Sequence, residues 1–131
     1  MATATSLVGR AAAVLTNGTV YGADCDLSDS LDGKLSVDLT FTLDTLTSVT
    51  LICCAGNAAN PTDPLWVNGQ LQTISLTGNT EAAMVFDCGG YRYARLSALG
   101  VGAVGASSLA YTYYYNDYEG TTKVDGEVRV G

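Results

Sequence analysis

The chain has 131 residues, 47% of them hydrophobic and 15% charged, and its formal net charge is −7. This length and apolar content predict one folded domain with its own core rather than a disordered segment. The acidity disfavours nucleic acid and anionic membranes as partners, and the absence of histidine excludes Ser–His–Asp and Cys–His catalysis within the chain. We therefore expect a protein that is not an enzyme and uses no cofactor. Its charge suits solubility or docking on a basic surface.

The first 16 residues are small and weakly polar, and we interpret them as an N-terminal arm or an edge strand. The apolar run from Ala11 to Leu15 lacks a basic flank, so we expect no secretory signal. No segment reaches the roughly 18 apolar residues that span a bilayer. These features predict folding in a cytoplasm. Asn17-Gly18, between two short apolar pairs, predicts a two-residue hairpin.

An acidic stretch follows and ends at Gly33, and we predict a loop or wide turn there. It carries four carboxylates, on Asp24, Asp26, Asp29 and Asp32. Carboxylate oxygens suit a hard cation such as calcium, but their spacing is not that of an EF-hand loop. A solvated acidic loop is the favoured interpretation, and we expect no metal.

The segment from Leu35 to Asp44 alternates apolar and polar residues without interruption. Successive side chains of a strand point to opposite faces, so this pattern predicts a half-buried antiparallel strand. The next run, Val49 to Cys54, is nearly all apolar. It predicts a strand that is covered on both faces or lies at an oligomer interface.

The middle of the chain alternates loops and short strands. Ala55 to Pro64 has the composition of a loop, and Trp66 follows it at a predicted strand start. We expect Trp66 to plug the core, with a role in binding as the alternative. Asn68-Gly69 predicts a second hairpin, and Gly78-Asn79 predicts a turn into the strand that follows.

Two further strands are predicted, over Tyr91–Leu96 and Leu109–Tyr115, and residues 121–130 suggest a small hairpin or an exchanged strand. No stretch shows helical spacing of its apolar residues. We therefore predict an all-β fold, an antiparallel β-sandwich or jelly roll of about eight or nine strands. Its core would span residues 17–116, with a tail or hairpin over residues 117–131.

The candidate partner-binding residues lie on the last two predicted strands. Tyr111, Tyr113 and Tyr115 share one face, which suits a sugar-binding platform, a protein interface, or the core or surface of a sheet. Arg92 and Arg95 have opposite strand parity. We expect one of them to pair with a carboxylate such as Asp87 and the other to reach a partner.

Four cysteines occur, at Cys25, Cys53, Cys54 and Cys88. Cys53 and Cys54 are adjacent, so on a strand they face opposite sides, and no CxxC pair is present. Buried free thiols are favoured over a disulfide or a metal site.

One phrase has a familiar form: Phe86-Asp87-Cys88-Gly89-Gly90-Tyr91-Arg92-Tyr93-Ala94-Arg95-Leu96. Together with the alternating strand, the tryptophan and the Gly-rich link before the last strand, it resembles small β-sandwich accessory proteins of tailed-phage virions. Capsid decoration, or cement, proteins are among them. The resemblance covers residues 34–116, and Cys88 stands where an apolar residue is common.

The resemblance implies a structural protein that binds the outer capsid surface and stabilises it. It implies the major capsid protein as partner, a homo-oligomer (trimer or dimer) with terminal segments crossing between subunits, and a location on the virion surface after synthesis in the bacterial cytoplasm. The alternative is a glycan-binding module of a phage tail or adhesion apparatus, which the tyrosines and Trp66 suggest.

Overall fold

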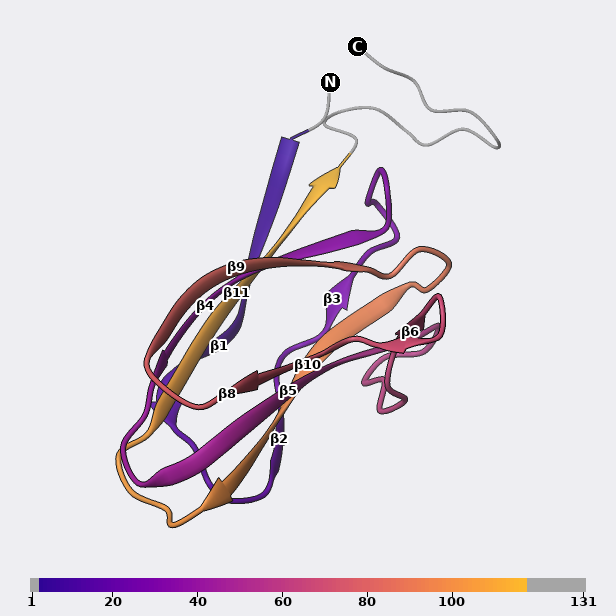
Figure 1. Ribbon diagram of the computed structural model, residues 1–131. Coiled ribbons are helices and arrows are strands. Elements are labelled where there is room, and N and C mark those ends of the chain that lie inside the picture. Colours follow the sequence, from indigo (N-terminus) through magenta and orange to yellow (C-terminus); the bar gives the residue numbers. More distant parts are fainter. Residues whose placement is uncertain (1–2, 118–131) are drawn as a thin grey trace.

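The computed structural model describes residues 3–117, which form antiparallel sheets packed face to face and contain no helix (Figure 1). The described residues therefore include no helix long and apolar enough to cross a membrane. The hairpin or exchanged strand predicted for residues 121–130 lies outside the described residues.

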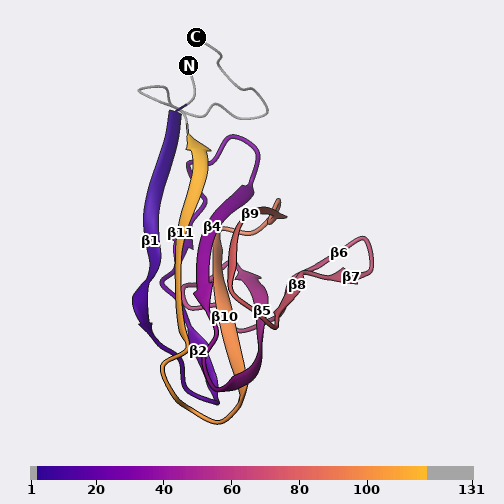
Figure 2. The same cartoon turned by 60° about the vertical axis from the view of Figure 1, so that its left-hand side comes forward.

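The two main sheets, A and B, are formed by different strands. Sheet A contains, in spatial order, β1 (Thr3–Val14), β11 (Ser108–Asp117), β4 (Lys34–Thr42) and β9 (Thr80–Asp87). Sheet B contains β2 (Thr19–Tyr21), β10 (Tyr93–Gly102), β5 (Leu46–Gly56) and β8 (Thr73–Leu76), and β3 (Cys25–Asp26) also pairs with β10. A separate ribbon joins β6 (Trp66–Val67) to β7 (Gln70–Leu71) and projects from the sandwich (Figure 2).

This strand order is that of a jelly roll: among the eight main strands the chain crosses between the two sheets at every connection except that from β5 to β8. The all-β sandwich predicted from the sequence is confirmed. Residues 3–117 form eleven strands rather than the eight or nine predicted, because β3, β6 and β7 are two-residue strands.

The alternating segment is confirmed as β4, whose inner side chains, Leu35, Val37, Leu39 and Phe41, are buried. The core that covers them comes from the facing strands of sheet B, with Val49, Leu51 and Cys53 of β5 and Leu96 of β10 fully buried. β5 is also the longest strand of sheet B. Its inward side chains are buried, and Cys54 on the opposite face is buried too, so the end of its apolar run is covered on both faces.

The two Asn-Gly pairs have different outcomes. Asn68 and Gly69 have φ angles of 52° and 78° and close the β6–β7 hairpin, as predicted. Asn17-Gly18 does not close a hairpin, because β1 pairs with β11 in sheet A whereas β2 pairs with β10 in sheet B. The local signal marks a bend at which the chain passes from one sheet to the other.

Candidate functional site

The candidate tyrosines of β11 lie mainly in the core. Tyr111 and Tyr113 are buried, with ring centroids 5.6 Å apart. The prediction that they bind a partner is therefore wrong, because their side chains face sheet B rather than solvent. Tyr115 is partly buried against the same core, and its role in binding stays a prediction.

Two polar phenols can be buried here because the strand pairing along one side of β10 is interrupted at Leu96. β10 pairs with the separate strands β2 and β3, and between them the backbone of Leu96 meets both tyrosines. Leu96 N–H donates to the Tyr113 hydroxyl at 3.1 Å, and the Tyr111 hydroxyl donates to the Leu96 carbonyl at 3.3 Å. Burial raises the pKa of both phenols. They therefore serve as neutral hydrogen-bonding partners of the core.

Gly9 makes room for this pair. A β-carbon built on Gly9 would lie 2.6 Å from atoms of Tyr111 and of Tyr113, closer than packed atoms approach. Gly9 also lies at an irregularity of β1, between the register partners Val8 and Arg10. The tyrosine pair thus depends on a glycine about a hundred residues earlier in the sequence.

The two arginines have different environments, as their strand parity predicts. Arg92 is exposed and forms a 3.2 Å ion pair with Asp26, with side-chain exposures of 54% and 43%. The hydrogen bond from Arg92 is the main reason why the pKa of Asp26 is lowered. Neither arginine pairs with Asp87, so that part of the prediction is wrong: Arg95 lies near Asp24 instead.

Arg95 is buried and fastens the loop after β5. Its guanidinium donates to the carbonyls of Pro61 at 2.9 Å and Asn60 at 3.2 Å. The Cζ atom of Arg95 lies 4.1 Å from the ring centroid of Tyr21, a cation–π contact. Asp24 accepts the backbone N–H of Asn60 at 2.6 Å. Arg95 is therefore a structural residue, and the prediction that it reaches a partner is wrong.

The acidic stretch is used for local contacts rather than gathered around one point. Asp24 and Asp26 meet the two arginines, and Asp32 accepts the backbone N–H of Lys34 at 3.0 Å. Within residues 3–117, no three acidic or cysteine side chains form a group that could hold a metal ion.

Trp66 does not plug the core. Its side chain is 61% exposed, whereas the preceding Leu65 is buried and Val67 packs against the core. The alternation of the ribbon therefore turns Leu65 inward and Trp66 outward. Trp66 lines a hollow together with Tyr91, which is also exposed.

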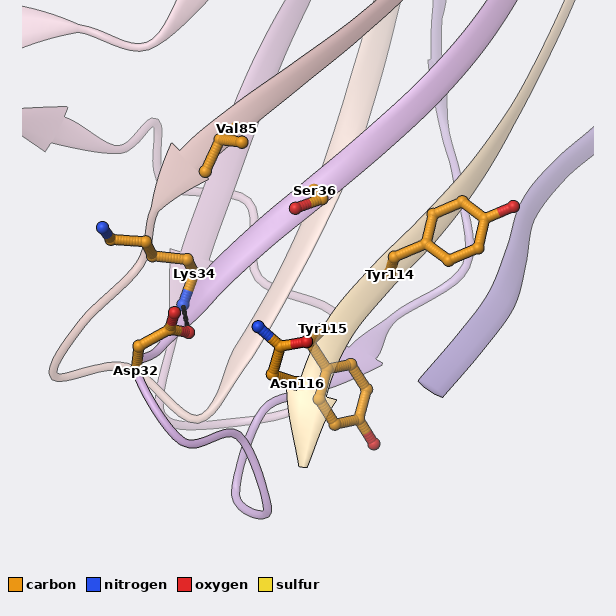
Figure 3. Close-up of a pocket in the computed structure, with 7 residues that line it drawn as sticks. All are labelled: Asp32, Lys34, Ser36, Val85, Tyr114, Tyr115 and Asn116. Atoms are coloured by element: carbon orange, nitrogen blue, oxygen red, sulfur yellow. Dashed lines mark hydrogen bonds between the residues drawn. The ribbon is translucent and has the colours of Figure 1, made fainter. Parts of the chain in front are cut away.

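A second hollow lies on the outer face of sheet A. It measures about 360 Å³, and Figure 3 shows Val85, Ser36 and Tyr114 side by side across β9, β4 and β11. Tyr114, which was not a sequence candidate, points outward because its parity is opposite to that of Tyr113. The hollow has a polar end, which is lined by Lys34, Asp32 and Asn116.

The first half of β1 lies beside this hollow and forms an open sheet edge. Residues 3–8 pair with β11 on one side, and among the described strands none lies along the other side. Leu7 and Val8 are exposed there. β1 contains no acidic residue, and its charged residue, Arg10, donates to the carbonyls of Leu109, Ala13 and Val14. We call residues 3–8 the β1 edge.

The other sheet edges are shorter or charged. β2 and β8 have three and four residues, and β9 carries Glu81 and Asp87. Short edge strands and charged side chains are common ways to prevent unwanted strand pairing. The β1 edge lacks both protections, although sequence reasoning identified it only as an arm or edge strand.

All four cysteines are buried free thiols, as predicted. Sγ of Cys53 lies 3.9 Å from Sγ of Cys88, and Cys54 faces the opposite side of β5. Burial, with smaller contributions from Cys88 and nearby carboxylates, raises the pKa of Cys25 to about 12. Burial also raises the pKa of Cys54.

We expect the protein to lose stability in alkaline solution. A thiol pKa raised above its ordinary value of 9.0 stabilises the fold below that pH, and this contribution is lost as the pH rises toward the folded pKa. Between these two pKa values, each such thiol lowers the free energy of unfolding by about 1.4 kcal/mol per pH unit. Urea unfolding at about pH 7.5 and about pH 9.5 measures the loss.

A Cys25→Ala variant is the control, because it removes one of the thiols whose pKa is raised. Its unfolding free energy should fall less steeply with pH than that of the wild type. Equal slopes for the two proteins would show that Cys25 does not carry the effect.

Comparisons with known proteins identify a fold and no family. No family model matches this chain, and no curated protein matches it. The chain is similar to a solved structure from a study titled "Bacillus endospore appendages form a novel family of disulfide-linked pili". The TM-score is 0.56 with 12% sequence identity, and the match covers 89% of each chain. At this identity the likeness shows a shared fold.

Proposed function

We propose that this chain is a non-enzymatic structural protein of a phage virion, a capsid decoration protein that binds its protein partner through the β1 edge. The observation that carries the proposal is this open edge, free of acidic residues, in a chain of net charge −7. An added strand would gain backbone hydrogen bonds there and cover Leu7 and Val8.

The choice of a capsid follows from the sequence resemblance, and the fold is compatible with it, since jelly rolls are common in capsid and lectin domains. The pilus protein with this fold belongs to an assembly by its title, which supports a role in assembly for this chain. All four cysteines are buried, so we propose that this chain's contacts, with the major capsid protein and with further copies of itself, are non-covalent.

Co-sedimentation with empty capsids tests the proposal, with capsids assembled from the major capsid protein that the proposal gives as the partner. Val8→Lys should weaken binding at least about tenfold, which corresponds to about 1.4 kcal/mol, because a lysine on a sheet edge obstructs strand addition. Light scattering on the free protein would show whether the same change also removes a dimer or trimer.

Two variants of similar exposure serve as controls. Val104→Lys, in the loop before β11, should bind as the wild type does, since Val104 is exposed but its loop adjoins the Val14 end of β1 rather than residues 3–8. Val85→Lys places the same charge in the outer hollow of sheet A and reports whether the contact extends there. Full binding by Val8→Lys would contradict the proposal.

A further inference from the structure

Two hollows meet at the end of the sandwich where the β6–β7 ribbon projects. The first, about 370 Å³, is lined by Trp66, Tyr91, Asn57 and Asp63, among others. The second, about 490 Å³, shares Asn57 and Tyr91 and continues to Arg92. We call the combined depression the Trp66 groove. The β6–β7 ribbon, which carries Trp66, lies on the opposite side of the molecule from β1 in both views (Figures 1 and 2).

The groove presents two aromatic side chains to solvent. Trp66 is 61% exposed and Tyr91 is 44% exposed, although the chain around each is fixed. Leu65 N–H donates to the Cys53 carbonyl at 2.8 Å, and Tyr91 N–H donates to the Cys88 carbonyl at 3.1 Å. Large exposed aromatics on anchored backbone are a feature of binding surfaces.

Polar groups with free hydrogen-bonding capacity lie beside the aromatics. Oδ1 of Asn57 accepts the backbone N–H of Arg92 at 3.2 Å, which leaves the amide NH₂ as a donor. The Asp63 carboxylate has no hydrogen bond or ion pair with any residue in the described range, so its oxygens remain acceptors. A carboxylate and an amide together suit hydroxyl groups, which both donate and accept.

The wall of the groove is held in place before any ligand binds. Arg95 and Asp24 fasten the backbone of Asn60 and Pro61, as described above, and Ala55 N–H donates to the Asp63 carbonyl at 3.1 Å. Asn60 has a φ of 60°, a left-handed conformation that these bonds maintain. Preorganisation of this kind lowers the entropic cost of binding.

We propose that the Trp66 groove binds an uncharged oligosaccharide. Trp66 and Tyr91 offer flat apolar faces to sugar rings, and Asp63 and Asn57 lie within the same hollow to bind ring hydroxyls. The net charge of −7 and the free carboxylate of Asp63 disfavour acidic glycans. The two joined hollows extend beyond one sugar ring, which favours a chain of sugars.

Trp66 fluorescence tests the proposal directly, because this is the single tryptophan of the chain. Neutral oligosaccharides on a broad glycan array serve as probes, followed by titration of each hit. Binding should shift the Trp66 emission to shorter wavelength in a saturable way and protect it from acrylamide quenching. Tyr91→Ala and Asp63→Asn should each weaken the affinity at least about tenfold.

Tyr114→Ala is the matched control, since Tyr114 lines the separate hollow on sheet A. It should bind glycans as the wild type does, and so should Val8→Lys, which separates this site from the β1 edge. The proposal is overturned if no neutral glycan binds, if only acidic glycans bind, or if Tyr91→Ala and Asp63→Asn keep full affinity.

Discussion

Replacing Tyr113 by alanine should lower the free energy of unfolding by about 3–5 kcal/mol, the usual cost of removing a large aromatic side chain from a core. Tyr113 has no exposed surface and packs against Tyr111 and Gly9. The change also leaves the buried N–H of Leu96 without its acceptor. Most single substitutions cost less than this.

Chemical unfolding of two companion variants separates the contributions. Tyr113→Phe keeps the ring and removes the hydroxyl, so it should cost about 1–3 kcal/mol for the unsatisfied N–H. Tyr114→Ala, on the outer face of the same strand, should cost under about 1 kcal/mol, since surface changes are usually small. Equal losses for Tyr113→Ala and Tyr114→Ala would refute the assignment of inner and outer faces.

The second large effect is expected at Arg95. Its replacement by alanine removes hydrogen bonds to the carbonyls of Pro61 and Asn60 and leaves Asp24 without its nearby cation, 3.9 Å away. We expect a loss of about 2–4 kcal/mol in the free energy of unfolding. Since these bonds fasten the groove wall, the same variant should also weaken any ligand binding at Trp66.

Arg92→Ala is the natural comparison, because Arg92 also pairs with an aspartate on the preceding acidic stretch. That pair is solvent-exposed, so its loss should cost far less stability than the loss of Arg95. Thermal or urea unfolding of both variants measures the contrast. A cost at Arg92 equal to that at Arg95 would contradict the distinction between a surface pair and a buried anchor.

The sequence predicts the sandwich well because one face of each main strand must be buried. The alternation over Leu35–Asp44 depends on nothing beyond strand periodicity, and β4 follows it residue by residue. The Asn68-Gly69 hairpin is equally local. The Asn17-Gly18 prediction is wrong because strand pairing, which links distant segments, decides whether two strands join one sheet.

The site was harder to predict for the same reason. Tyr111 and Tyr113 have the same strand parity as buried Leu109, a signal that favours the core. Their burial also depends on hydrogen bonds to the backbone of Leu96 and on the space left by Gly9, and neither contact is visible in the local sequence. Likewise, Leu65 and Val67 share the face opposite to Trp66, which was a usable sign that the indole points outward. The hollows themselves join residues 30 or more positions apart and leave no local pattern.

The β1 edge is the central claim, and amide hydrogen exchange tests it most directly. Exchange would be compared between the free protein and the protein bound to empty capsids. We predict that binding slows exchange most strongly in residues 3–8, because an added strand takes up their outward amides. Bound protein whose residues 3–8 exchange as fast as in the free state, with protection only elsewhere, would contradict the account.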